Sequence, residues 1–228
     1  MKNLTIDIGT EKKDEAESLI NLGDPIAFVS DYTELGTDCI KAKALDDRIG
    51  CALIMEALQG EYSFDLYACF TVQEEVGLRG AQIAAYSVNP DLALVLEGTT
   101  CSDVPGVEPY EQSTQLGGGA ALSILDRMTY SAKNLVDYIA DLAVKKKIQY
   151  QFKQTTTGGN DAGKIQSTRS GVKVASISAP CRYIHSPVSV VSKKDIESCK
   201  DLLKAILTDL SNNQNIIESL KNGGTIDV

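Results

Sequence analysis

Acidic residues stand in pairs or alone directly after apolar stretches of this sequence. Glu74 and Glu75 follow the apolar run FDLYACFTV, and Glu97 ends the run LALVLE. Asp46 and Asp47 begin the stretch DDRIGCALIMEALQG. Adjacent acids most often lie on a solvated turn, so one such pair by itself predicts little about chemistry.

The chain has a single histidine, His185, which follows the run VKVASIS by a short loop. Taken alone, such a residue is more often a half-buried histidine with satisfied hydrogen bonds than a ligand. Crowded carboxylates repel one another unless cations are present. Carboxylates with one imidazole form a ligand set for zinc, cobalt or manganese, so these residue types permit a divalent metal site.

Strands and helices alternate along most of the sequence, which predicts an α/β fold with a largely parallel central sheet between helices. Buried strands are predicted at the continuous apolar runs 64–72 and 92–97, and further strands at 148–152 and 172–178. Helices are predicted at residues 46–60, 80–88, 131–147 and from about Ser192 onward, where Asp195 has the spacing of a capping box. The first of these is apolar nearly all round and is expected to be buried. Ligands of such sheets bind beyond the carboxyl ends of the strands, where the candidate residues would meet.

Residues 1–43 differ in pattern from the rest of the sequence. They contain short β-like runs at 3–9, 25–32 and 38–43, with one helical stretch at 12–23 between the first two runs. We therefore expect a boundary between residues 1–43 and an α/β domain at 44–228. The formal net charge of −9 makes a nucleic-acid partner unlikely. No stretch has the length and apolar character of a membrane span, and six cysteines without a CxxC pair favour a reduced, cytoplasmic protein.

Five motifs in order resemble the glutamyl, deblocking and tetrahedral aminopeptidases, a family of dinuclear metallo-aminopeptidases. They are KALDDRIG, TVQEEVGLRGA, LVLEGTT, GGNDAG and APCRYIHSPVSVV. The resemblance covers roughly residues 6–197. It implies a zinc-exopeptidase-like fold, metal-dependent removal of N-terminal residues from peptides, and assembly into a homo-oligomer.

The resemblance implies a ligand set for two metal ions. Asp46 would bridge both ions, Glu75 and His185 would complete the site of one, and Glu97 would bind the other, where many relatives carry Asp. The ions would be zinc, cobalt or manganese.

The resemblance also implies catalytic roles for two acids. Glu74 would be the general base that takes a proton from water, while its neighbour Glu75 holds a metal. Asp47 would belong to the catalytic group, and its peptide bond to Asp46 is expected to be cis. The motif GGNDAG, residues 158–163, is assigned to a pocket loop without a defined role, and a simple glycine-rich turn is an equal alternative.

Family members carry an earlier segment ending in a His-x-Asp motif and then an inserted β-rich domain. We therefore expect residues 1–43 to be the C-terminal remnant of that oligomerisation domain, and 44–228 to be a catalytic domain lacking its first strands. Without the second histidine, this chain should bind at most one ion tightly.

Three interpretations remain open from the sequence. The chain could be a shortened version of an ordinary aminopeptidase, or a catalytically impaired relative that serves as a binding or assembly module. The third is glycoside hydrolysis, since such proteins are sometimes labelled glucanases and paired carboxylates can serve that reaction. A histidine at the metal-ligand position argues against the third.

Overall fold

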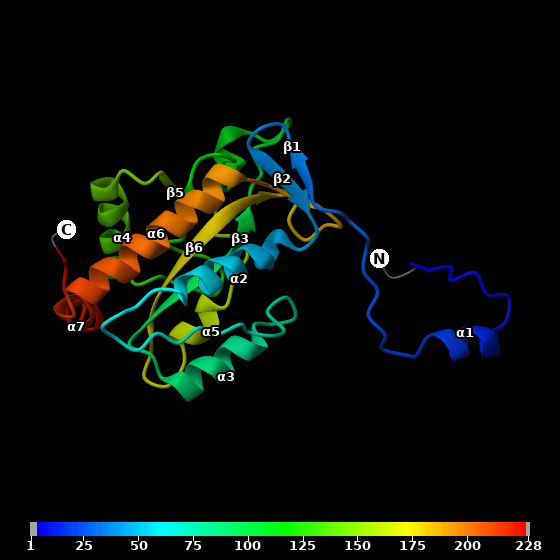
Figure 1. Cartoon of the computed structure of the whole chain (residues 1–228), viewed down its shortest axis with the longest axis horizontal. Helices are drawn as coiled ribbons and strands as arrows, with labels where there is room; N and C mark the ends of the chain where they lie inside the picture. Colours follow the sequence, from blue (N-terminus) through cyan, green and yellow to red (C-terminus); the bar gives the residue numbers. More distant parts are fainter. Residues whose placement is uncertain (1–3, 227–228) are drawn as a thin grey trace.

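The computed structural model describes residues 4–226 (Figure 1). Its helices are α1 (Lys13–Leu19), α2 (Leu45–Ala57), α3 (Arg79–Val88), α4 (Lys133–Lys146), α5 (Ala162–Gln166), α6 (Lys193–Asn212) and α7 (Asn215–Lys221), with a 3-10 turn at Pro109–Glu111. Its strands are β1 (Thr33–Leu35), β2 (Cys39–Ala42), β3 (Leu92–Thr100), β4 (Ala120–Leu122), β5 (Tyr150–Phe152), β6 (Lys173–Arg182) and β7 (Ser189–Ser192).

The strands form one sheet in the order β1-β2-β7-β6-β4-β5, and β3 pairs with β6. The predicted α/β class is confirmed, but the sheet is mixed instead of largely parallel. Only β3–β6 and β4–β5 are parallel pairs. The other pairs are antiparallel, and in two of them, β1–β2 and β6–β7, a short loop reverses the chain direction.

Helices cover both faces of the sheet, and β3 shows this in its alternating side chains. Leu92, Leu94 and Leu96 pack against the main core, which also contains residues of α2, α4 and α6. Ala93 and Val95 pack on the opposite face against a smaller core that includes residues of α5. A strand with apolar side chains on both faces is expected in a three-layer α/β protein.

The predicted helices of the C-terminal half are confirmed. On α4, the apolar stripe of Leu135, Ile139 and Leu142 is buried. At the start of α6, the Ser192 hydroxyl accepts a hydrogen bond from Lys194 N at 3.2 Å, the usual form of N-cap. Asp195 does not complete a capping box: its carboxylate accepts hydrogen bonds from the N–H groups of Gly117 and Gly119 instead.

Two sequence predictions about burial are wrong. Residues 64–72 form no strand, and Tyr67, Phe70 and Val72 are exposed, because a strand needs a neighbour that local sequence cannot reveal. On α2, only one side of the helix is buried, and Met55 faces solvent with 61% exposure.

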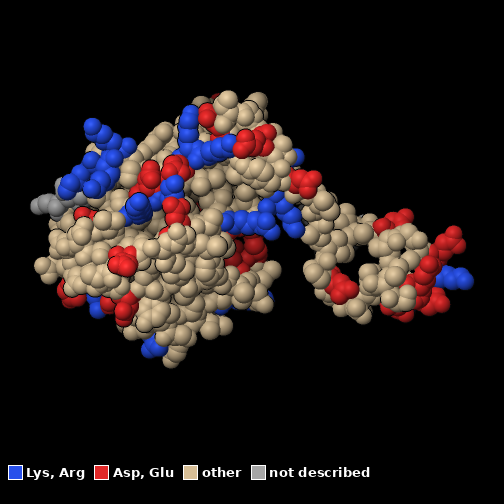
Figure 2. Space-filling view, viewed as in Figure 1, with Lys and Arg blue, Asp and Glu red and all other residues tan. Residues whose placement is uncertain are grey.

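Residues 4–32, which we call the N-terminal arm, extend away from the body of the protein (Figure 1). Of the β-like runs predicted in residues 1–43, the first two form no strand in the described residues, whereas the third becomes β2. The arm carries exposed apolar residues such as Ile26, Phe28 and Val29, and acidic groups are prominent on it (Figure 2). None of the described helices is both long and apolar enough to cross a membrane. The predicted boundary at residue 43 and the cytoplasmic location stay predictions.

Candidate metal centre

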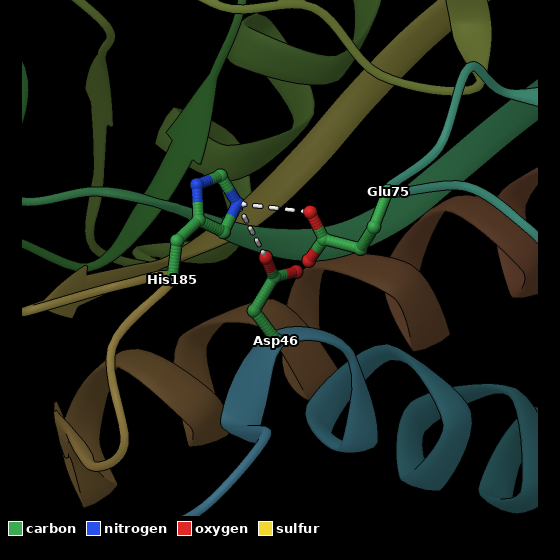
Figure 3. Close-up of side chains that lie close together, drawn as sticks. All are labelled: Asp46, Glu75 and His185. Carbon is green, nitrogen blue, oxygen red and sulfur yellow. Dashed lines mark ion pairs between the residues drawn. The ribbon is translucent and has the colours of Figure 1, made fainter. Parts of the chain in front are cut away.

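Asp46, Glu75 and His185 converge at one point above the sheet (Figure 3). One ligand atom from each lies within 4.8 Å of the others. His185 Nε2 is 3.3 Å from Glu75 Oε2 and 3.5 Å from Asp46 Oδ2. The fold therefore brings together three of the four ligands that the sequence predicted.

Each residue reaches this point from the end of a different segment. Asp46 lies at the start of α2, Glu75 follows the coil 64–72, and His185 lies in the loop between β6 and β7. The peptide bond between Asp46 and Asp47 is cis, as the sequence predicted. Asp46 Oδ1 also accepts a hydrogen bond from Gly98 N at 3.2 Å.

A glycine is needed at position 98 because β3 passes close to Asp46. A Cβ atom added to Gly98 would lie 2.8 Å from Asp46 Cβ, closer than side chains tolerate. The small residue thus allows the end of β3 to support the Asp46 carboxylate. Burial and the nearby Glu75 raise the pKa of Asp46, so a cation at this point would favour its ionised form.

The two measured separations between donor atoms fit a divalent ion of the zinc type. Ligand atoms about 2.1 Å from a tetrahedral ion lie roughly 3.4 Å apart. The separations of 3.3 and 3.5 Å around His185 Nε2 match that spacing. Two carboxylates and one imidazole are also ligand types that zinc, cobalt and manganese accept.

Glu74 and Asp47 lie beside this group and carry perturbed pKa values. Burial, and next the charge of Glu75, raise the pKa of Glu74 to about 7. Burial raises the pKa of Asp47 to about 8, although Asp47 Oδ1 accepts a hydrogen bond from Gly50 N at 2.9 Å that works in the opposite direction. Both groups line the same cleft as Asp46.

Glu97 lines this cleft but does not join the three-residue group. Its Oε1 accepts hydrogen bonds from Asn160 Nδ2 at 2.7 Å and from the Ser178 hydroxyl at 3.2 Å. Burial raises the pKa of Glu97 well above its usual value. Glu97 is therefore held by its neighbours on β6 and in the loop before α5.

Sequence reasoning missed the roles of two residues in the GGNDAG loop. Asn160 is buried and positions Glu97. Asp161 is buried, accepts a hydrogen bond from the Thr71 hydroxyl at 2.5 Å, and raises the pKa of both Glu74 and Asp47. The Gly-Gly pair marked a loop, but the direction of the following side chains depends on where β6 and the 64–72 coil lie.

Comparison with known proteins places the chain in a family. The sequence matches the M42 glutamyl aminopeptidase family over residues 1–202, and the chain belongs to that family. A protein named putative aminopeptidase from Acetivibrio thermocellus is 40% identical over 210 residues. That match covers 89% of this chain and 63% of the relative.

Solved structures agree with this assignment. Aminopeptidase APDkam598 from the archaeon Desulfurococcus kamchatkensis has a TM-score of 0.89 and 36% identity, covering 97% of this chain and 62% of that one. The TET1 peptidase of Pyrococcus horikoshii, described as assembling into a tetrahedron or a large octahedral shell, has a TM-score of 0.77 and 30% identity over 88% of this chain and 59% of that one. A Thermotoga maritima structure named endoglucanase has a TM-score of 0.73 and 33% identity over 93% and 61%.

The relatives are longer than this chain. The chain spans 63% of the length of the Acetivibrio thermocellus protein and 62% of the Desulfurococcus kamchatkensis structure. Family membership and fold are thus shown, whereas the activity of the longer relatives is only proposed for this chain.

Proposed function

We propose that this chain acts as a metal-dependent aminopeptidase, a hydrolase that removes N-terminal residues from peptides. The observation that carries the proposal is the convergence of Asp46, Glu75 and His185 beside Glu74. Membership of the M42 glutamyl aminopeptidase family supports it. Zinc, cobalt and manganese are the ions that suit the donor set.

In this proposal the neighbouring glutamates have separate tasks. Glu75, with Asp46 and His185, holds the ion, which when bound would supply Lewis-acid activation of water and of the peptide carbonyl. Glu74 takes the proton from the water that attacks the peptide. Without an ion, burial raises the pKa of Glu74 to about 7, and the half-buried carboxylate beside the ion is placed to accept a proton from water.

We propose one tightly held ion per chain. The three-residue group gives that ion protein ligands, whereas Oε1 of Glu97 already accepts two hydrogen bonds. We assign Asp47 a positioning role in this site. Its carboxylate accepts a hydrogen bond from Gly50 N at the beginning of the helical part of α2 and so holds the segment that carries Asp46. The exposed apolar residues of the N-terminal arm and the assemblies of the Pyrococcus horikoshii relative support a homo-oligomer.

The assignment of the two glutamates is tested by a matched pair of variants, Glu74→Gln and Glu75→Gln. Each removes one charge from adjacent positions. Glu74→Gln should lower peptide turnover by about two to four orders of magnitude and leave metal affinity nearly unchanged. Glu75→Gln should weaken metal binding, measured by calorimetry on metal-free protein. The opposite pattern would exchange the two roles.

The same measurements separate the alternatives. A binding or assembly module would hold the ion without turnover of any aminoacyl substrate by the unaltered chain. A glucanase would hydrolyse β-glucan with equal rate after His185→Ala, since glycoside hydrolysis by paired carboxylates needs no imidazole ligand. The geometry around His185 favours the peptidase.

A further inference from the structure

His185 reaches the metal group from a loop that the imidazole itself does not fix. The loop, residues 183–188, connects β6 to β7, and the side chain extends from it toward Asp46 and Glu75 (Figure 3). The side chain is 63% exposed, so packing around the ring restricts it little. A metal site keeps its affinity when the residues around its ligands hold those ligands in place. The position of this ligand must therefore be set by contacts elsewhere in the loop.

The backbone of the loop has an unusual conformation. Tyr183 and His185 have φ angles of 60° and 59°, in the left-handed region that residues with a side chain rarely adopt. Such residues persist only where the surrounding structure holds them. Ile184 packs against the main core, and the Ser186 hydroxyl donates to the main-chain oxygen of Val188 at 2.7 Å. These contacts hold the middle and the end of the loop, which leaves its start beside β6.

The start of the loop is held by Arg182, the last residue of β6. Its Nε donates to Asp103 Oδ1 at 2.6 Å, and its Nη2 donates to Asp103 Oδ2 at 2.9 Å. The same Nη2 donates to the main-chain oxygen of Asp103 at 3.2 Å. A planar guanidinium that binds a carboxylate through two parallel hydrogen bonds is fixed in direction as well as in distance. Arg182 stands three residues before His185, so this contact sets where the loop begins.

Asp103 is itself held by two further donors. It lies in the segment after β3, and its carboxylate accepts hydrogen bonds from Leu116 N at 3.0 Å and from Cys101 Sγ at 2.9 Å. Burial acts to raise the pKa of Asp103, but the hydrogen bonds from Arg182 and these donors outweigh it and lower the pKa to about 2. Asp103 is therefore ionised near neutral pH and gives Arg182 a fixed counter-charge.

The segment that binds Asp103 is fastened to α6. Gly117 N and Gly119 N donate to the two carboxylate oxygens of Asp195 at 2.8 and 2.7 Å. Asp195 is fully buried in the first turn of α6. Leu116, whose N–H binds Asp103, directly precedes Gly117 and is therefore held by the same contact. These hydrogen bonds connect the buried start of α6 to the end of β6.

We propose that Asp103 and Arg182 are positioning residues for His185. Their ion pair fixes the end of β6, and the left-handed loop then carries the imidazole to Asp46 and Glu75. The purpose of this arrangement rests on the proposed metal-dependent function, but its first test needs no metal. A pair that only stabilised the fold would lower the thermal midpoint and leave the imidazole of the folded protein unchanged.

The single histidine of the sequence makes the test direct, because one imidazole alone contributes to the NMR spectrum of the tag-free chain. Arg182→Lys keeps the charge and loses the two parallel hydrogen bonds, whereas Asp103→Asn keeps the shape and loses the charge. In metal-free protein well below its thermal midpoint, each variant should shift the imidazole resonances toward those of a solvated histidine. NMR relaxation should show faster motion of the ring in both.

The matched control is Arg169→Lys. Arg169 also makes two guanidinium hydrogen bonds, both to the main-chain oxygen of Tyr86, and it precedes β6 at the opposite end of the strand from Arg182. This variant loses a comparable contact, so its thermal midpoint can fall. The imidazole resonances should nevertheless stay as they are in the unaltered chain.

Zinc affinity is the second measurement. Calorimetry should show a loss of about tenfold to 100-fold for Arg182→Lys and for Asp103→Asn, the range typical when the support of a metal ligand is removed. The double variant should lose little more than the larger single effect, because both changes break one contact.

The outcomes separate this proposal from the proposed function. Shifted imidazole resonances in a chain that binds no zinc would support the positioning role and count against the metal-dependent function. Unchanged resonances in the folded variants would overturn the positioning role, and so would unchanged zinc affinity where the unaltered chain binds zinc. Failure of both variants to fold would also overturn it, because the pair would then serve the fold as a whole.

Discussion

Saturation with a divalent ion should raise the thermal stability of this chain by an amount that the site allows us to calculate. The ion would bind the folded state only, because Asp46, Glu75 and His185 come from three separate segments that meet on folding. At a free-ion concentration of 100 times Kd, such binding adds about 2.7 kcal/mol to the free energy of unfolding. For a chain of this size, each kcal/mol raises Tm by about 2–4 °C, which gives a shift of about 5–11 °C.

The assay is differential scanning fluorimetry over a series of zinc, cobalt or manganese concentrations in metal-free buffer. His185→Ala should remove most of the shift. The same variant should change Tm little without metal, because the His185 side chain is 63% exposed. The matched control is Asp137→Asn on α4, which removes an exposed carboxylate paired with Lys133 and should keep the full shift.

Two results would refute this reasoning. If His185→Ala kept the metal-induced shift, the ion would bind elsewhere and the three-residue group would not be its site. If elemental analysis found two tightly bound ions per chain, Glu97 would have to take part despite its hydrogen bonds to Asn160 and Ser178.

Three further predictions concern the same chain. Without metal, the free energy of unfolding should fall as pH rises from about 5 to about 8. The reason is that the pKa values of Glu74, about 7, and Asp47, about 8, are raised in the folded state, which therefore binds more protons over this range. Urea unfolding at several pH values measures the free energy of unfolding, and an increase with pH would contradict the prediction. Asn160→Ala should lower the free energy of unfolding by about 1–3 kcal/mol, because Glu97 loses a buried donor, and an unchanged urea midpoint would argue against that support. Light scattering should show concentration-dependent self-association through the N-terminal arm, and a stable monomer at all concentrations would oppose it.

Local features of the sequence predicted the helices of this protein well. The cap at Ser192 and the apolar stripe on α4 depend on neighbours within a few turns, and both are present. The convergence of Asp46, Glu75 and His185 was also predictable, because residues at the ends of adjacent segments meet and because ordered motifs resembled a known family. The chemistry of the candidate site follows from residue types that the sequence shows directly.

Features that depend on distant partners were not predictable. The apolar run at residues 64–72 has the composition of a strand, yet pairing needs a neighbour beside it. Asp195 had the spacing of a capping residue, but two glycine N–H groups remote in sequence bind its carboxylate instead. Asn160 could be placed in a loop, but its contact with Glu97 depends on how that loop lies over β6.

The main chain of residues 64–71 forms no hydrogen bond within the described part of the protein, so a protease can cut the chain there. Tyr67 and Phe70 are 62% and 50% exposed, and chymotrypsin cleaves after such residues when the main chain is free to enter its active site. A cut there separates α2 from α3, yet α2 packs on β3 and remains part of the main core. The two fragments should therefore stay together after cleavage, and amide hydrogens of this coil should exchange with solvent long before those of β6.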